Sequence, residues 1–295
     1  MSDPEPDAES AIIFRRLDID DDGLNLFDRL TDQLEKMDKA NLGANDFQKT
    51  FERVADDKER LVYVRKPDGT AFTANIIAEV GSAAQGSWLA SYPKKTPNLP
   101  FGDDHSPHRM VIAARCPTGA MQKMESMYKD FLVVLDGTRN QDQNVEDTNG
   151  DKFKVTEWTG REDGDKDKPA NLMILRLKPT YEKSLTIFLA VLARKVGDTY
   201  SPDMLPDHKG SYFAHDKAKL VQRPYKDEDG FLIAPHELYS KLTEGTLFSA
   251  QISLSTYIIK DRNPRFMDSK IYHINVDKLT VLNPGYTAIP PAVGI

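Results

Sequence analysis

Basic and aromatic side chains gather in one short stretch near the carboxy terminus of the chain. They are Lys260, Arg262, Arg265, Lys270 and Phe266, in a loop between two β-type segments. Lysine and arginine neutralise phosphates, and aromatic rings stack on unpaired bases. The stretch therefore predicts a surface that binds single-stranded nucleic acid.

A second stretch with the residue types for chemistry is the acidic turn at residues 18–23. It places acids at the first, third and fifth positions of a calcium-type loop, with Gly23 at the sixth. Leu26 and Arg29 then occupy the ninth and twelfth positions, where further oxygen ligands belong, and an arginine there repels a cation. The pattern favours a solvated turn, and Asp22 is the predicted N-cap of the helix that follows.

Other groups capable of metal binding or catalysis are isolated. His105 and His108 precede Cys116, but Pro107 separates the histidines and no fourth ligand follows at zinc spacing. The sequence has no nucleophile elbow, zinc-protease motif, phosphate-binding loop or dinucleotide fingerprint. We expect a non-enzymatic protein without a metal or cofactor.

Charge is distributed unevenly between the two halves of the chain. Residues 1–150 hold 18 basic and 27 acidic side chains, whereas residues 151–295 hold 21 and 19. A general binder of duplex DNA carries a large basic face, so this balance argues against one and leaves room for a small groove in the second half. One cysteine, an acidic amino terminus and no apolar run near the ~18 residues of a membrane helix predict an intracellular protein, in cytoplasm or nucleus, without a membrane partner.

Two long β-type segments flank the basic stretch. From residue 247 to 255, small polar side chains alternate with Phe248, Ala250, Ile252 and Leu254, as in a strand with one face on a core. In the second segment Tyr272, Ile274 and Val276 share a face, and Leu279 and Val281 continue in a new phase. We therefore predict a bend near Asp277.

The rest of the chain predicts an α+β protein. We expect a disordered acidic tail at 1–12, an α/β portion at 13–140, a polar linker at 141–152 and a β-rich, barrel-like portion at 153–295. Within the α/β portion, apolar spacing predicts a helix at residues 23–37, and the run 131–135 predicts a buried strand.

The two carboxy-terminal segments and their basic loop resemble the closing strands of OB-fold proteins that bind single-stranded DNA. The resemblance covers about forty residues and rests on the pattern of Gly245–Ile259 and 271–283. It implies that the β-rich portion is an OB-like barrel. It also implies that the residues facing the nucleic acid are Tyr257, Lys260, Arg262, Arg265, Phe266, Lys270, Tyr272 and His273.

On this interpretation the protein is an accessory factor for single-stranded nucleic acid, DNA in preference to RNA. The alternative is a structural or assembly protein, such as a viral coat or scaffold subunit, for which the proline- and glycine-rich loops and extended termini are typical. Self-association stays open in both interpretations.

Overall fold

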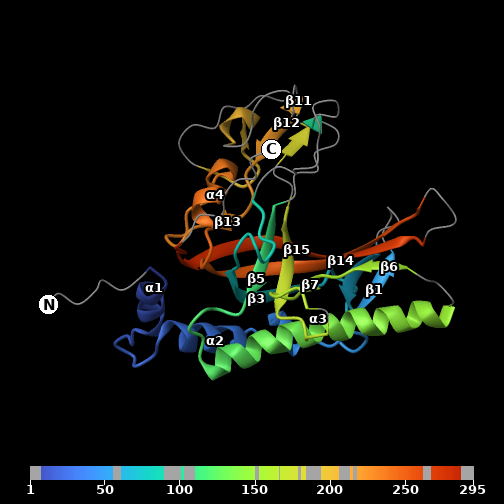
Figure 1. The fold of residues 1–295 in the computed structure, drawn as a ribbon, viewed down its shortest axis with the longest axis horizontal. Helices are drawn as coiled ribbons and strands as arrows, with labels where there is room; N and C mark the ends of the chain where they lie inside the picture. Colours follow the sequence, from blue (N-terminus) through green and yellow to red (C-terminus); the bar gives the residue numbers. More distant parts are fainter. Residues whose placement is uncertain are drawn as a thin grey trace.

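The computed structural model describes most of the chain and shows a large mixed sheet flanked by helices (Figure 1). The described residues are 8–55, 61–89, 101–102, 110–149, 153–165, 167–178, 181–183, 194–205, 213–214, 218–261 and 267–286. The α-helices are α1 (Ala8–Leu17), α2 (Leu26–Lys36), α3 (Gln122–Asn149) and α4 (Leu238–Lys241). Short 3-10 turns include η1 (Asp38–Ala40) and η2 (Leu42–Ala44). The α+β class predicted from the sequence is confirmed.

The main sheet has ten strands within the described part of the chain. They are β1 (Phe51–Ala55), β2 (Leu61–Arg65), β3 (Thr73–Val80), β5 (Val111–Arg115), β6 (Lys154–Thr156), β7 (Thr159–Gly160), β8 (Leu172–Leu177), β13 (Tyr225–Lys226), β14 (Leu247–Ile259) and β15 (Ser269–Asn283). Two small sheets lie apart from it: β9 (Tyr181–Lys183), β10 (Thr199–Tyr200) and β12 (Ala218–Val221) form one, and β4 (Phe101–Gly102) pairs with β11 (Phe213–Ala214) in the other.

Five strands of the main sheet close into a ring. The hydrogen-bonded order is β3, β5, β8, β15, β14 and back to β3. All neighbours are antiparallel except β8 and β15, which run parallel. Alternate side chains fill the ring: Ile76, Ile112, Leu175, Phe248, Ile252, Ile274 and Val276 are all fully buried. Closure removes the free edges that an open five-stranded sheet would have.

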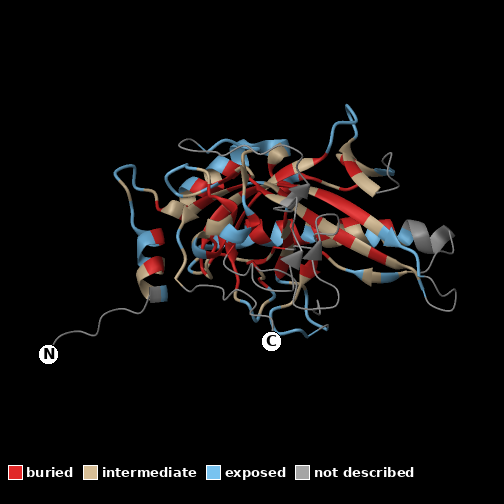
Figure 2. Ribbon diagram, turned by 90° about the horizontal axis from the view of Figure 1, so that it is seen from above, coloured by how far each residue is buried: buried red, intermediate tan, exposed pale blue. Residues whose placement is uncertain are grey.

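The pair β14–β15 is longer than the ring and extends beyond it. On the extension, β14 pairs with β2, which pairs with β1, and β15 pairs in parallel with β6. Buried and less buried residues alternate along these strands, as Figure 2 shows, in agreement with the two-residue period of a strand. Opposite Gln251 and Ile252 the partner changes from Lys278 to Val276, so Asp277 is an extra residue. This bulge confirms the predicted bend.

Helices α2 and α3 lie together on one side of the long pair, with β11 and β12 on the other side (Figure 1). Helix α2 begins after Asn25, whose side chain accepts the backbone N–H of Asp28 while the Asp28 carboxylate accepts the N–H of Asn25. The helix is confirmed, but Asn25 replaces Asp22 as its cap. The buried face of α2 contains Phe27, Leu30 and Leu34.

Helix α3 corrects two expectations. Residues 131–135, predicted to be a strand, are helical, and α3 continues through residues 141–149 of the predicted linker. Tyr128, Phe131 and Leu135 recur at helical spacing and are buried in the main core, whereas Val133 is 67% exposed. Helix α1 likewise includes residues 8–12 of the predicted tail.

The ring uses strands from both halves of the sequence. Strands β3 and β5 precede residue 140, and β8, β14 and β15 follow residue 153. One buried hydrophobic cluster includes side chains from α2, α3 and all five ring strands. The sheet therefore has no boundary where the sequence predicts a linker.

A buried ion-pair cluster fixes α1 against one end of the ring. Arg16 of α1 pairs with Glu79 of β3, and both side chains are fully buried. Arg115 of β5 reaches the same carboxylate at 2.6 Å, and Arg16 also donates to the carbonyl oxygen of Gly245 at 2.5 Å. Because each buried charge has a partner, the cluster ties the amino-terminal helix to β3, β5 and the start of β14.

Candidate nucleic-acid interface

The predicted binding residues separate into three groups. Tyr257 and His273 are half-buried, and their rings contact each other across β14 and β15 with centroids 4.9 Å apart. Lys260 is exposed just after the end of β14. Arg262, Arg265 and Phe266 lie outside the described residues, so their part in binding stays a prediction.

Lys270 and Tyr272 form the third group, and they face the interior. Lys270 has no exposed surface and Tyr272 is 2% exposed. They are in phase with Ile274 and Val276, which fill the ring, whereas His273 and Asn275 point outward. For these two residues the structure corrects the prediction of a surface role, because nucleic acid in solution cannot reach buried side chains in this conformation. The alternation of apolar residues along this segment already indicated that Tyr272 and Lys270 face inward.

Both side chains bind the carboxylate of Asp142 on α3. The Lys270 ammonium lies 2.6 Å from Asp142 Oδ2, and the Tyr272 hydroxyl donates to the same oxygen at 2.6 Å. Arg53 of β1 approaches Oδ1 at 2.6 Å. Asp142 is itself 2% exposed and lies on the same helix face as Phe131, Leu135 and Thr138. The network joins α3, β1 and β15 at the start of β15.

Aromatic rings enclose this network. The Trp158 ring lies 5.0 Å from that of Tyr272, and its indole N–H donates to the carbonyl oxygen of Leu135 at 3.2 Å. The Lys270 ammonium sits 5.1 Å from the centroid of the Tyr272 ring. The base of the carboxy-terminal hairpin is therefore held by charge, hydrogen bonds and ring packing together.

The two ends of the basic loop are also tied to each other. The Asp268 carboxylate accepts the backbone N–H of Asp261 at 2.9 Å, and the Asp268 carbonyl accepts the N–H of Lys154 at 2.8 Å. Two acids of the loop thus have structural contacts at its base. Between them, residues 262–266 contribute the cations Arg262 and Arg265.

Outward side chains make a continuous row across the ring, beside the hairpin. Their backbone positions pair in sequence from β5 to β3: Val111 with Arg176, Arg176 with Asn275, Asn275 with Ser253, and Ser253 with Thr73. Trp88 pairs with Val111 at the β5 end. All six residues are half-buried. The row combines an indole, a guanidinium, an amide and hydroxyls on the outside of the ring.

The residue types alone did not point to Arg176, the one cation of this row. Arg176 is the single charge in β8, whose sequence is Leu-Met-Ile-Leu-Arg-Leu. Exposed Lys178 follows it and pairs with Asp277, the bulge residue, at 2.9 Å. A lone arginine in an apolar strand was the available signal, because a charged side chain is rarely buried unless it is paired, which favours the outer face.

The metal and thiol candidates have structural roles within the described residues. The Asp20 carboxylate accepts the backbone N–H of Leu24, which lowers the Asp20 pKa, and it pairs with Arg29. No group of three or more histidine, cysteine or acidic side chains there is arranged to hold a metal ion. Burial raises the pKa of the Cys116 thiol to about 11. His105 and His108 lie outside the described residues.

No helix in the described part of the chain is both long and apolar enough to span a bilayer. Comparison by sequence finds no matching family model and no matching curated protein. Comparison of structures finds weak similarity to the single-stranded DNA-binding protein from bacteriophage Enc34. The alignment covers 80% of this chain and 92% of that protein, with 11% identity and a TM-score of 0.36.

Two further structures of the phage protein give similar alignments. For its complex with ssDNA the TM-score is 0.32 and the identity 11%, over 81% of this chain and 99% of that chain. For a C-terminal truncation the values are 0.25 and 12%, over 80% and 97%. All three TM-scores are below 0.5.

Proposed function

We propose that this protein binds single-stranded nucleic acid, DNA in preference to RNA, as a non-enzymatic accessory factor. The observation that carries the proposal is the order of the ring. Numbered along the chain from one to five, β3, β5, β8, β14 and β15 lie in the order one, two, three, five, four. A five-stranded Greek-key barrel of this kind supports the interpretation as an OB fold.

In OB folds the binding surface is the face of strands two and three, bordered by the loop after strand one and the loop between strands four and five. Here these strands are β5 and β8, which contribute Val111 and Arg176 to the outward row. The bordering loops are residues 81–110 and 260–268. The second is the basic loop that the residue types alone predict to bind phosphates.

The proposed surface has rings for the bases and cations for the phosphates of a nucleic-acid strand. Trp88 and Tyr257 offer rings for stacking, worth on the order of 1–3 kcal/mol per base. Arg176, Lys260, Arg262 and Arg265 offer charge to the phosphates. Since the chain as a whole has a net charge of −7, we expect modest affinity. Because this surface contacts mainly phosphates and base faces, binding there should fall with salt and depend little on sequence.

The test is fluorescence anisotropy of a labelled single-stranded 30-mer over a range of salt. Arg262→Gln/Arg265→Gln should weaken binding and reduce the slope of log K against log salt by about 1.4, because each lost phosphate contact removes ~0.7. Arg15→Gln/Lys129→Gln removes two exposed cations elsewhere and is the matched control. A folded wild-type protein that fails to bind at low salt would refute the proposal.

The assembly interpretation has one observation in its favour. Phe14, Ile19 and Met121 are 66%, 71% and 46% exposed. Phe14 lies in α1, and Ile19 follows that helix by two residues. Apolar residues exposed in this way can form contacts between subunits. Light scattering over a range of protein concentrations distinguishes this function, since assembly would then occur without nucleic acid.

A further inference from the structure

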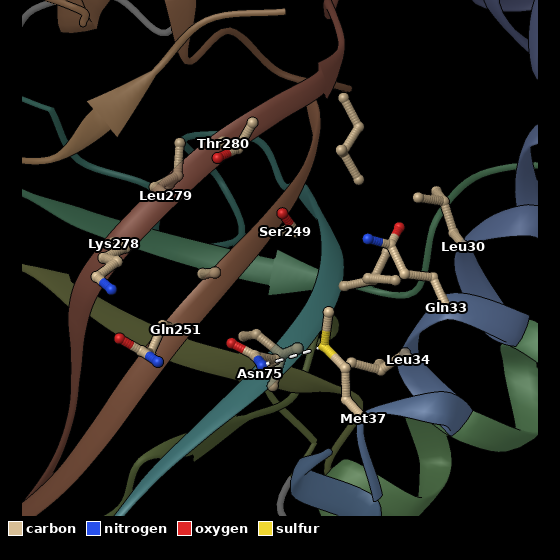
Figure 3. Close-up of a pocket in the computed structure, with 14 residues that line it drawn as sticks. Leu30, Gln33, Leu34, Met37, Asn75, Ser249, Gln251, Lys278, Leu279 and Thr280 are labelled. Carbon is tan, nitrogen blue, oxygen red and sulfur yellow. Dashed lines mark hydrogen bonds between the residues drawn. The ribbon is translucent and has the colours of Figure 1, made fainter. Parts of the chain in front are cut away.

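A groove lies between α2 and the outer surface of the ring, beside the part of the outward row on β3 and β14 (Figure 3). Two rows of paired positions cross β3, β14 and β15 to form its floor. One row is Asn75, Gln251 and Lys278, and the other is Ile77, Ser249 and Thr280. Side chains at paired positions of neighbouring strands lie ~5 Å apart at Cβ, so each row presents adjacent groups.

Helix α2 supplies the opposite wall. Leu30, Leu34 and Met37 line the groove together with Gln33, and the space has a volume of about 420 Å³. That volume lies in the range of small-molecule sites. Met37 is 40% exposed, and its sulfur accepts a hydrogen bond from Asn75 Nδ2 at 3.3 Å. The wall is therefore apolar, with one polarisable thioether at the level of the amides.

The polar groups that line the groove retain most of their hydrogen-bonding capacity. Within the described part of the chain, the side chains of Gln33, Ser249, Gln251 and Thr280 make no hydrogen bond to protein. Exposed Lys278 forms no ion pair with the described residues. A ligand could thus bind these groups without displacing an existing contact.

The bulge at Asp277 is what places the cation in this groove. Without the extra residue, the alternation that buries Ile274 and Val276 would turn Lys278 inward. With it, Leu279 and Val281 are buried and Lys278 and Thr280 point outward. Bulges of this kind re-aim side chains beside functional sites. The shift puts an ammonium next to the Gln251 amide.

We propose that this groove is a nucleotide site that favours adenine. Asparagine and glutamine amides match the paired donor and acceptor on the edge of adenine, and Asn75 and Gln251 are adjacent here. Met37, Leu30 and Leu34 pack against the face of the base. Lys278 binds the phosphate. The nucleotide is either free or one unit of a longer strand. The groove shares no residue with the outward row, whose Thr73 and Ser253 lie two positions from Asn75 and Gln251 along β3 and β14.

Calorimetric titration with dAMP and dTMP tests the proposal, with methyl NMR of Met37 to locate binding. Gln251→Leu should weaken dAMP binding by about tenfold, since a bidentate amide contact discriminates by that order. Gln141→Leu, which makes the same change at an exposed glutamine of α3 outside the groove, is the matched control. Lys278→Gln should weaken both nucleotides, because it acts on the phosphate.

A second set of titrations distinguishes the source of the nucleotide. If dAMP binds and Arg262→Gln/Arg265→Gln leaves its affinity unchanged, the site takes free nucleotide. If only a 30-mer of deoxyadenylate is weakened by Gln251→Leu, and one of thymidylate is not, the site takes one unit of a strand. Binding of dAMP without any binding of 30-mers would remove the proposed function and keep this site. Gln251→Leu without effect on either ligand would overturn the inference.

Discussion

Replacing Asp142 with asparagine should destabilise the protein strongly. The change keeps the shape of the side chain but leaves the Lys270 ammonium, which has no exposed surface, without a counter-charge. Removing one partner of a buried pair costs about 3–5 kcal/mol. Arg53 retains 18% of its side-chain surface and can turn toward water, so it adds little to the loss. We expect the free energy of unfolding to fall by about 4 kcal/mol.

Urea unfolding followed by tryptophan fluorescence measures this change close to its origin, because Trp158 packs on Tyr272. With a slope near 3 kcal/mol per molar, the midpoint should fall by about 1.3 M. Lys123→Met, which breaks an exposed pair with Asp32, is the control and should leave the midpoint unchanged.

A double variant makes the reasoning refutable even where the single variant folds poorly. Asp142→Asn/Lys270→Met removes both charges, and an apolar replacement of a buried pair is often neutral or stabilising. The double variant should therefore recover at least half of the lost free energy. A cost below about 1 kcal/mol for Asp142→Asn, or a double variant as unstable as the single one, would show that buried charge does not hold the hairpin.

Three further predictions concern the ends of the ring and the thiol beside it. Glu79→Gln should lower the free energy of unfolding by about 3–5 kcal/mol in urea titrations, since it leaves Arg16 buried without its carboxylate; an unchanged midpoint would contradict this. Gly245→Ala should cost roughly 1–3 kcal/mol, because Gly245 has φ +83° and a Cβ would lie 2.2 Å from Tyr286. Removing the ring in Gly245→Ala/Tyr286→Ala should relieve only the steric part of that cost. The Cys116 thiol, with its pKa raised to about 11 by burial, should react with iodoacetamide slowly at pH 8 and faster as the pH rises toward 11. Mass spectrometry follows the reaction, and a rate at pH 8 equal to that of urea-unfolded protein would be the contrary result.

The outer and inner faces of β14 and β15 could be predicted because a strand alternates with a period of two. Phe248, Ile252 and Ile274 are inside the ring as their spacing indicates, and the change of phase marks the bulge at Asp277. The same alternation would have placed Lys270 and Tyr272 inside. Their residue types suggested nucleic acid instead, and a buried partner on a distant helix, Asp142, could not be foreseen from them.

Helix α3 was harder to predict because local composition opposes it. Val133 and Val134 favour a strand, and the polar residues after 138 resemble a linker. The helix is stabilised by packing of Tyr128, Phe131 and Leu135 into a core made by other segments. The ring order was beyond reach for a similar reason, since β3 finds its partner in β14 through tertiary packing and no local pattern encodes that pairing.

The closure of the ring also sets when the protein can fold. Glu79 and Leu247 are paired neighbours, yet 168 positions separate them in the chain. A ribosome adds about 5–20 residues per second, so roughly 10–30 seconds pass between the synthesis of β3 and that of its partner strand β14. During that interval Ile76, Ile77 and Val80 have no β14 to cover them, and non-local pairing of this kind is slow even after synthesis. We therefore expect the nascent chain to depend on chaperones or rapid completion more than a protein whose strands pair in order.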